Sequence, residues 1–223
     1  MGNVIILQET VEKPITLMGQ RAGICWESDI LNAEKNYKRG LSCLEAEHGR
    51  VLEYVNVEMI LEGYSARVIR EWYTHIGGAP TRLQATRYVD YGEFKYIIPN
   101  SIKSNEDALR LYKKHMEGIK ELCYQFTEEF NIPREDVALF LPLGMETRVV
   151  DKRNLRNLME MSHQRLCTRA YWEYRELMRD ICDALKNISE EWKYIVENYF
   201  LPKCKIMGYC PEKQSCGLVN MNI

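Results

Sequence analysis

Apolar residues recur with two different periods along the chain, and each period predicts one kind of element. From Val55 to Leu61 every second residue is apolar, which is typical of a strand with one buried face. From Leu109 to Phe130 the apolar positions lie three and four residues apart, which predicts an amphipathic helix. Ser65 and Ser104 stand where helix N-caps are expected, and Gly63 stands where the first of these strands should end.

The whole set of patterns predicts an α+β fold, in which helices pack around a small, mainly antiparallel sheet within a single domain. The predicted strands cover residues 4–7, 51–61, 86–98 and 145–150. The predicted helices cover residues 14–26, 31–47, 66–72, 104–130, 154–185 and 189–200, with a helical turn after Pro133. The chain contains no internal repeat and no Gly/Ser linker, so we expect one domain over residues 1–201 and a cysteine-containing tail over 202–223.

Charge narrows the range of partners. A hydrophobic content of 46% excludes a disordered chain, and a net charge of -2 argues against a nucleic-acid or membrane-surface partner. The charge is uneven, however. Residues 64–88 hold four basic residues and one acidic residue, and residues 148–179 hold eight and four. This distribution indicates a pocket for small phosphorylated ligands. The apolar runs are too short to cross a bilayer and no export signal is visible, so we expect a cytoplasmic protein.

Two segments carry candidate chemistry. The first joins a predicted helix to a loop with Gly77, Gly78 and Arg82, and backbone amides beside glycine together with arginine donors suit a phosphate. An exposed turn with surface arginines explains the same pattern. The second is a stripe on the predicted helix over 154–185, formed by Asn154, Ser162, Arg165 and Arg169. Helical spacing places these four on one face, which is either an anion pocket or a solvated surface.

The remaining motifs are less specific. His48 is isolated, the chain has no known zinc spacing, and no Gly-x-Ser-x-Gly nucleophile elbow is present. Cys204, Cys210 and Cys216 are evenly spaced and would supply three thiolates to zinc or an iron–sulfur centre, but a fourth ligand is missing. We therefore expect free thiols in the tail and no metal site.

The residues that follow resemble a known family. Residues 70–76 read Arg-Glu-Trp-Tyr-Thr-His-Ile, and Arg87-Tyr88 follows them. This arrangement resembles the Arg-His-Arg-x-x-Ser-x-Asn-x-x-Ser-x-Arg-Tyr signature of the flavin-dependent thymidylate synthases. His75 matches the signature histidine, whereas Thr74 and Ile76 replace its arginines, and one extra residue precedes Arg87.

Three other stretches are similar to the same family, in the same order. Residues 47–53 look like its His-x-(Ser/Thr)-x-x-Glu segment, with Arg50 at the Ser/Thr position. Residues 154–159 are similar to its Asn-Ala-Arg-Ser-Leu-Met. Residues 165–173 are similar to its Arg-Ala-x-x-x-Ala-Gln-Trp-Glu. Ala138 stands where the family often has a dUMP-binding arginine, a loss for which Arg82 or Arg148 would have to compensate.

The resemblance implies a homotetramer with shared active sites that bind FAD, dUMP and folate. The implied reaction is the reductive methylation of dUMP to dTMP, with methylenetetrahydrofolate as carbon donor and NAD(P)H as reductant. Arg165 would be the catalytic residue, since a fixed cation beside the uracil stabilises the charge of the activated ring. The resemblance assigns FAD binding to His48, Arg50, Thr74, His75, Ile76, Arg82, Asn154 and Arg156. It assigns dUMP binding to Glu71, Arg82, Leu83, Gln84, Ala85, Thr86, Arg87 and Arg165.

The departures from the family pattern keep other functions open. A non-catalytic flavin- or nucleotide-binding relative is the first alternative, motivated by Thr74, Ile76 and Ala138. A helical interaction protein whose arginine loop binds protein or RNA is the second. Neither the choice between NADPH and NADH nor the role of the three tail cysteines follows from the sequence.

Overall fold

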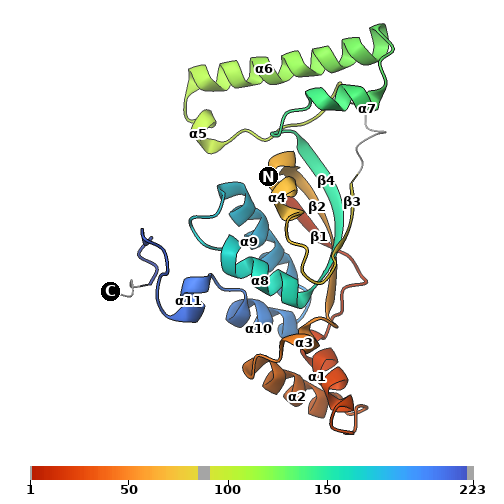
Figure 1. Ribbon diagram of the computed structural model, residues 1–223, viewed down its shortest axis with the longest axis vertical. Helices are drawn as coiled ribbons and strands as arrows, with labels where there is room; N and C mark the ends of the chain where they lie inside the picture. The colour runs from red at the N-terminus through yellow and green to blue at the C-terminus, as the bar shows by residue number, and fades with distance from the viewer. Residues whose placement is uncertain (1, 85–90, 220–223) are drawn as a thin grey trace. The chain divides into compact units, whose positions relative to one another are not determined.

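The computed structural model describes residues 2–84 and 91–219. Its central element is a four-stranded sheet with the order β1-β2-β4-β3, formed by β1 (Asn3–Ile6), β2 (Asn56–Ser65), β4 (Glu146–Asn154) and β3 (Thr81–Gln84) (Figure 1). The register shows that β2 and β4 are antiparallel, because Glu62 pairs with Arg148 at 3.1 Å and Glu58 pairs with Lys152 at 2.9 Å. Sheet and helices together confirm the predicted α+β class.

Contacts divide the chain into two compact units, each made of three segments. Unit 1 comprises residues 1–3, 61–74 and 82–150, and unit 2 comprises residues 4–60, 75–81 and 151–223. The division passes through β2 after Ile60 and through β4 after Val150. No helix in the described part of the chain is long and apolar enough to span a membrane.

Unit 1 holds the longest helix. Its helical elements are α4 (Ala66–Trp72), α5 (Asn100–Lys103), α6 (Glu106–Tyr124), the π-helical turn Gln125–Glu129, α7 (Arg134–Val137) and the 3-10 turn Ala138–Phe140. A small core of Tyr91, Cys123 and Val137 is covered by apolar side chains of the same unit. The predicted cap of α4 is confirmed, since the Ser65 hydroxyl accepts the Val68 N–H at 3.2 Å.

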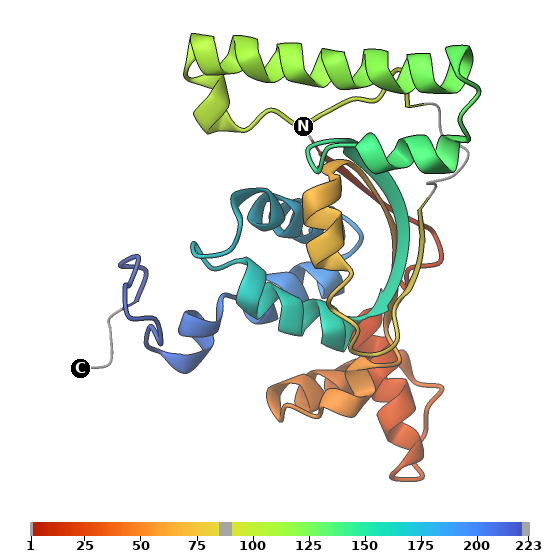
Figure 2. The same ribbon diagram turned by 45° about the horizontal axis from the view of Figure 1, so that its top comes forward.

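Unit 2 holds α1 (Pro14–Ile24), α2 (Ala33–Glu45), α3 (Gly49–Leu52), α8 (Leu155–Arg165), α9 (Trp172–Lys186), α10 (Glu190–Tyr199) and α11 (Lys203–Met207). Helix α9 packs against both α8 and α10, the three helices drawn teal to blue in Figure 2. Leu158, Tyr174, Ile181 and Trp192 are fully buried among them. Ser189, where the last predicted helix is expected to begin, caps α10 by accepting the Trp192 N–H at 3.3 Å.

The predicted helix over 154–185 is wrong in one respect, because it is two helices. α8 ends at Arg165 and α9 begins at Trp172. The Arg175 guanidinium donates to the Thr168 carbonyl at 2.7 Å and the Ala170 carbonyl at 3.2 Å, so carbonyls of the connecting segment are bonded outside any helix. Arg169 therefore does not continue the predicted stripe.

Several predicted boundaries also shift. Ser104 closes α5, and Asn105 caps α6 instead, since its side chain accepts the Ala108 N–H at 3.0 Å. β2 does not end at Gly63 but continues to Ser65, and Gly63 within it has a φ of 75°, a left-handed conformation that glycine adopts without strain. Residues 49–52 are helical rather than extended.

The strand predicted over 86–98 lies partly outside the described residues, since 85–90 are not described. Within 91–98 the structure shows only a bridge between Tyr96 and Met145. β3 was not predicted, because its four residues form an edge strand with little apolar character. The strands predicted over 4–7 and 145–150 correspond to β1 and β4.

Candidate active site

Arg165, the last residue of α8, lies against His75 and Tyr174 within unit 2. Its Nε and Nη2 atoms lie 3.2 and 3.0 Å from Nε2 of His75. Its guanidinium carbon lies 4.3 Å from the centroid of the Tyr174 ring, which is a cation–π geometry. The His75 and Tyr174 rings meet edge-on, with centroids 6.1 Å apart. The guanidinium is thus fixed by a nitrogen acceptor and an aromatic face.

Electrostatics sets the protonation state of His75. Burial, followed by the positive charges of Arg165 and Arg153, lowers the pKa of His75 to about 4. The imidazole is therefore neutral at neutral pH, and its Nε2 is the acceptor toward Arg165. A neutral partner orients the arginine without cancelling its positive charge. The guanidinium of Arg165 therefore keeps its full positive charge for interaction with a ligand.

A buried ion pair lies beneath this region. Arg153 and Asp151 at the end of β4 are fully buried, with Nε of Arg153 2.6 Å and Nη2 2.8 Å from the two carboxylate oxygens. Arg153 also donates to Asn157 at 2.7 Å. Two charges with this bidentate geometry satisfy one another in the low-dielectric core. The network holds the end of β4 against the first turn of α8.

The predicted glycine loop packs on the same turn. Asn154 caps α8 by accepting the Asn157 N–H at 2.9 Å. Gly78 has a φ of 71°, and a Cβ built there would overlap the Asn154 amide. A Cβ at Gly77 would lie 3.0 Å from the Asn157 amide nitrogen. Both glycines let the backbone approach the start of α8, where helical N–H groups favour anions.

The other members of the predicted stripe are not part of this arrangement. Ser162 is fully buried, and its hydroxyl donates to the Met159 carbonyl at 2.7 Å. Arg169 lies in the segment between α8 and α9 and pairs with Glu212 at 3.1 Å. The four residues therefore do not form one helical face as their spacing predicts, because Arg169 lies beyond the end of α8.

His48 and Arg50 line a cavity of about 440 Å³ within unit 2. Arg21 lies on the same cavity, together with the exposed rings of Trp26 and Tyr54. Two arginines and two aromatic faces suit an anionic group attached to a flat ring, and the residues present therefore fit part of a flavin or pterin ligand. Sequence reasoning named His48 and Arg50 but missed Arg21, Trp26 and Tyr54.

Arg156 is held in ion pairs. Its Nη1 lies 2.7 Å from Glu53 and its Nε lies 3.2 Å from Glu160. The cation is therefore shared between two surface carboxylates, which compete with any bound phosphate. Arg156 is therefore a weaker candidate for binding an anionic cofactor than the sequence predicts.

The remaining predicted ligands on unit 1 surround Tyr73. The Arg82 guanidinium lies 4.6 Å from the Tyr73 ring centroid and donates to the Tyr73 carbonyl at 2.9 Å. Gln84 accepts from the Tyr73 hydroxyl at 3.0 Å. Tyr73 thus joins two predicted substrate ligands, a role that the sequence did not indicate.

The other predicted residues of this region are more exposed. Thr74 donates its hydroxyl to the Glu71 carbonyl at 2.7 Å, while Leu83 is 70% exposed. Ile76, which belongs to unit 2, is also 70% exposed and is available to a ligand. Ala85, Thr86 and Arg87 lie outside the described residues.

Ala138 stands where the family often has an arginine that binds dUMP, and Arg148 is one of two residues that could replace this arginine. Arg148 was considered a replacement for an arginine at position 138, but it pairs with Glu62 at 3.1 Å. Ala138 begins a 3-10 turn. Arg148 is thus already engaged, and Arg82 is the more suitable of the two arginines.

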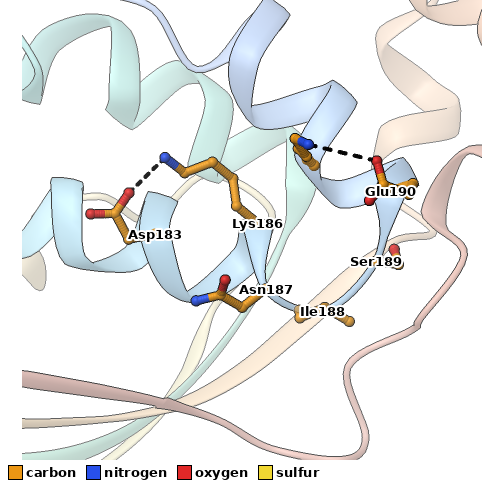
Figure 3. Close-up of a pocket in the computed structure, with 7 residues that line it drawn as sticks. Asp183, Lys186, Asn187, Ile188, Ser189 and Glu190 are labelled. Atoms are coloured by element: carbon orange, nitrogen blue, oxygen red, sulfur yellow. Dashed lines mark ion pairs between the residues drawn. The ribbon is translucent and has the colours of Figure 1, made fainter.

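A cavity at the turn between α9 and α10, about 770 Å³ in volume, has different chemistry (Figure 3). Asp183 and Lys186 on its rim lie 2.6 Å apart, and Glu190 and Lys193 lie 3.8 Å apart. Its charges are neutralised by sequence neighbours, and it holds no predicted site residue. It is a surface hollow rather than a candidate active site.

Comparison with known proteins assigns the family. The model of the thymidylate synthase complementing proteins matches residues 6–189. A flavin-dependent thymidylate synthase of Thermococcus onnurineus is 30% identical over 195 residues, covering 84% of this chain and 78% of the relative. One of Clostridium tetani is 25% identical over 240 residues and covers 97% of this chain and 94% of the relative.

A solved structure shares the fold of this chain. A crystal structure of thymidylate synthase X from Helicobacter pylori with FAD and dUMP has a TM-score of 0.70 and 18% identity. It covers 89% of this chain and 99% of that chain. The class defined by fold and sequence is therefore that of the thymidylate synthase complementing proteins. The chain belongs to the flavin-dependent thymidylate synthase family, as the residue motifs predict.

Proposed function

We propose that this chain is an FAD-dependent thymidylate synthase that converts dUMP to dTMP. Methylenetetrahydrofolate supplies the carbon and NAD(P)H the reducing equivalents, which makes the enzyme a methyltransferase. Family membership and the FAD and dUMP of the Helicobacter pylori structure support the proposal. FAD, when bound, would supply the redox chemistry that links NAD(P)H to the reduction of the transferred carbon unit.

The observation that carries the proposal is the contact between Arg165 and His75. A uracil ring that is activated by loss of its N3 proton carries negative charge on N3 and on its two carbonyl oxygens. The guanidinium of Arg165, held by neutral His75 and the Tyr174 ring, is a preorganised cation for that charge. Because its orientation is fixed before the substrate binds, little reorganisation is needed during the reaction.

Phosphate recognition is proposed for the Arg82 side chain. The Tyr73 carbonyl and ring orient its guanidinium, and an oriented fork of donors suits a nucleoside monophosphate. Glu71, Leu83 and Gln84, together with Ala85, Thr86 and Arg87, complete the proposed dUMP-binding segment. We propose that the residues assigned to FAD are those named by the resemblance. The cavity at His48 and Arg50 supports that role, because arginines and aromatic rings line it and suit the phosphates and the flat ring of a flavin.

We also propose a homotetramer with shared active sites, which the family resemblance implies. Helix α6 of unit 1 exposes Leu111, which is 64% accessible, and Leu122, which is 37% accessible. Exposed apolar side chains on an amphipathic helix favour association with another copy. Size-exclusion chromatography with light scattering measures the assembly directly.

Flavin binding and turnover separate the enzyme from its alternative. The purified chain is titrated with FAD, and NADPH oxidation is then followed with and without dUMP and methylenetetrahydrofolate. Oxidation and dTMP formation that need both substrates support the synthase. FAD binding without any dTMP identifies a non-catalytic relative. Failure to bind FAD excludes the synthase and leaves a nucleotide-binding relative or the helical interaction protein.

A further inference from the structure

Four cysteines from separate parts of unit 2 line one cavity of about 420 Å³. Cys167 comes from the segment between α8 and α9, and Cys204 comes from α11. Cys210 and Cys216 come from the tail that follows. The tail supplies three evenly spaced thiols, and the fold adds a fourth that lies 37 positions before the first of them. Cys167 is therefore the fourth thiol that the tail sequence lacks.

Independent contacts hold these segments together. A hydrogen bond with Thr168 lowers the pKa of Cys216 and joins the tail to the residue after Cys167. Arg169 and Glu212 pair across the same two segments at 3.1 Å. Burial, and after it the neighbouring Cys210, Cys167 and Cys216, raises the pKa of Cys204. The four cysteines thus line one cavity, and all four are free of disulfides.

The charge around the cavity is suited to a thiolate centre. Arg165, Arg169 and Lys203 line it, with Glu212 as the carboxylate among its lining residues. A zinc ion with four thiolates, or a cubane iron–sulfur cluster with four, carries a net negative charge that nearby cations stabilise. Cys204 is 8% exposed, whereas Cys216 is exposed, so the cavity runs from the interior to the surface.

We infer that Cys167, Cys204, Cys210 and Cys216 together bind a thiophilic metal centre, either a zinc ion or an iron–sulfur cluster. Within the described residues, no three His, Cys, Asp or Glu side chains are grouped around one point as a single ion requires. A cluster spans such a cavity with the thiols apart, whereas a zinc ion has to draw them inward. In either case the thiols lose their protons as the metal binds.

The centre would fix the segment that follows Arg165. Cys167 lies two positions after Arg165, in the break between α8 and α9. A bond from Cys167 to a metal also held by the tail ties this break to residues 204–216. The sequence predicts free thiols in the tail, whereas a bound metal centre gives the tail a structural role. The inference stands on the four thiols and does not depend on the proposed function.

The test is metal analysis of the full chain purified without oxygen and without a metal-binding affinity tag. Zinc, iron and acid-labile sulfide are measured per chain in the wild type and in Cys210→Ser and Cys216→Ser. Cys25→Ser is the matched control, because Cys25 is an exposed cysteine that does not line the four-cysteine cavity. It is the C-cap residue of α1. We expect about one zinc ion, or iron with equimolar sulfide, in the wild type and the control.

Both tail variants should lose at least half of that metal and fall in melting temperature, while dTMP formation is recorded separately. Zinc alone identifies the ion, and iron with sulfide identifies the cluster. A chain that holds no metal, takes up none from added zinc or by cluster reconstitution, and titrates all eight thiols overturns the inference. Disulfides among the four cysteines, or equal metal loss in Cys25→Ser, overturn it as well.

Discussion

Arg165 donates to Nε2 of His75, and the two residues are 90 positions apart in the chain. The contact is possible because the imidazole is neutral, since its pKa is about 4. Protonated His75 would have no acceptor at Nε2 and would repel the guanidinium. The geometry of the proposed catalytic cation is therefore linked to the protonation state of one histidine.

This link predicts how stability depends on pH. The pKa of His75 is lower in the folded chain than the ordinary value of 6.5, so the unfolded chain binds the extra proton first. The contribution of neutral His75 to the free energy of unfolding is fully present above about pH 6.5 and is lost as the pH falls toward 4. This loss amounts to at most about 3 kcal/mol. Thermal unfolding of the wild type and His75→Gln between pH 7.5 and 4 measures it, in steps of about 0.5.

The wild type should lose more stability than His75→Gln over that window, so the difference between their melting temperatures changes with pH. Comparing the two chains removes the titration of all other groups that they share. Parallel melting curves across the window would show that His75 is not buried beside Arg165 as described.

Gly78 is predicted to tolerate no side chain. Its φ of 71° is costly for other residues, and an added Cβ overlaps the Asn154 amide that caps α8. Gly78→Ala should lower the free energy of unfolding by about 2 kcal/mol or more. Gly118→Ala is the control, because it lies inside α6 with open space around its Cβ and should stabilise the chain by about 0.5–1 kcal/mol.

Urea unfolding of both variants at one pH gives the two values. Equal and small effects at positions 78 and 118 would contradict the close packing of the glycine loop on α8.

The buried pair of Asp151 and Arg153 predicts a large cost for removing one charge. Asp151→Asn leaves a fully buried guanidinium without its carboxylate, and should destabilise the chain by about 3–5 kcal/mol. Lys152→Ala, the adjacent residue of β4, breaks a partly exposed pair with Glu58 and should cost less than about 1 kcal/mol.

Calorimetry or urea unfolding separates the two variants. A cost at Asp151 no larger than that at Lys152 would mean that water reaches the pair.

The parts of the fold that depend on local signals were predictable. The alternation from Val55 to Leu61 identified β2 because a strand exposes every second residue, and Val55, Val57, Met59 and Leu61 are all fully buried. The Ser65 hydroxyl accepts from the amide three positions ahead, so the local sequence was enough to predict this cap. Ser104 and Asn105 are both good caps one residue apart, and the sequence does not choose between them.

Features that depend on distant contacts were not predictable from pattern. The break between α8 and α9 is stabilised by Arg175, whose bonds to Thr168 and Ala170 have no periodic signature. Tyr174 stacks with Arg165 only because the chain turns at that break. Spacing alone placed Arg165 on one helical face with Arg169, which was wrong. The family resemblance assigned Arg165 to dUMP and His75 to FAD, and their direct contact was not predicted.

The thiol cavity shows the same limit. Three tail cysteines were recognised by their even spacing, whereas Cys167 joins them only in the folded chain.

The most direct test of the central claim is dTMP formation by the wild type, Arg165→Lys and Arg165→Ala. Each is incubated with FAD, NADPH, dUMP and methylenetetrahydrofolate, and dTMP is quantified by chromatography, with FAD binding and assembly size as controls. The wild type should form dTMP, Arg165→Ala should be at least ~100-fold slower, and Arg165→Lys should fall between them. A wild type that binds FAD but forms no dTMP, or an Arg165→Ala enzyme of near-normal rate, would contradict the account.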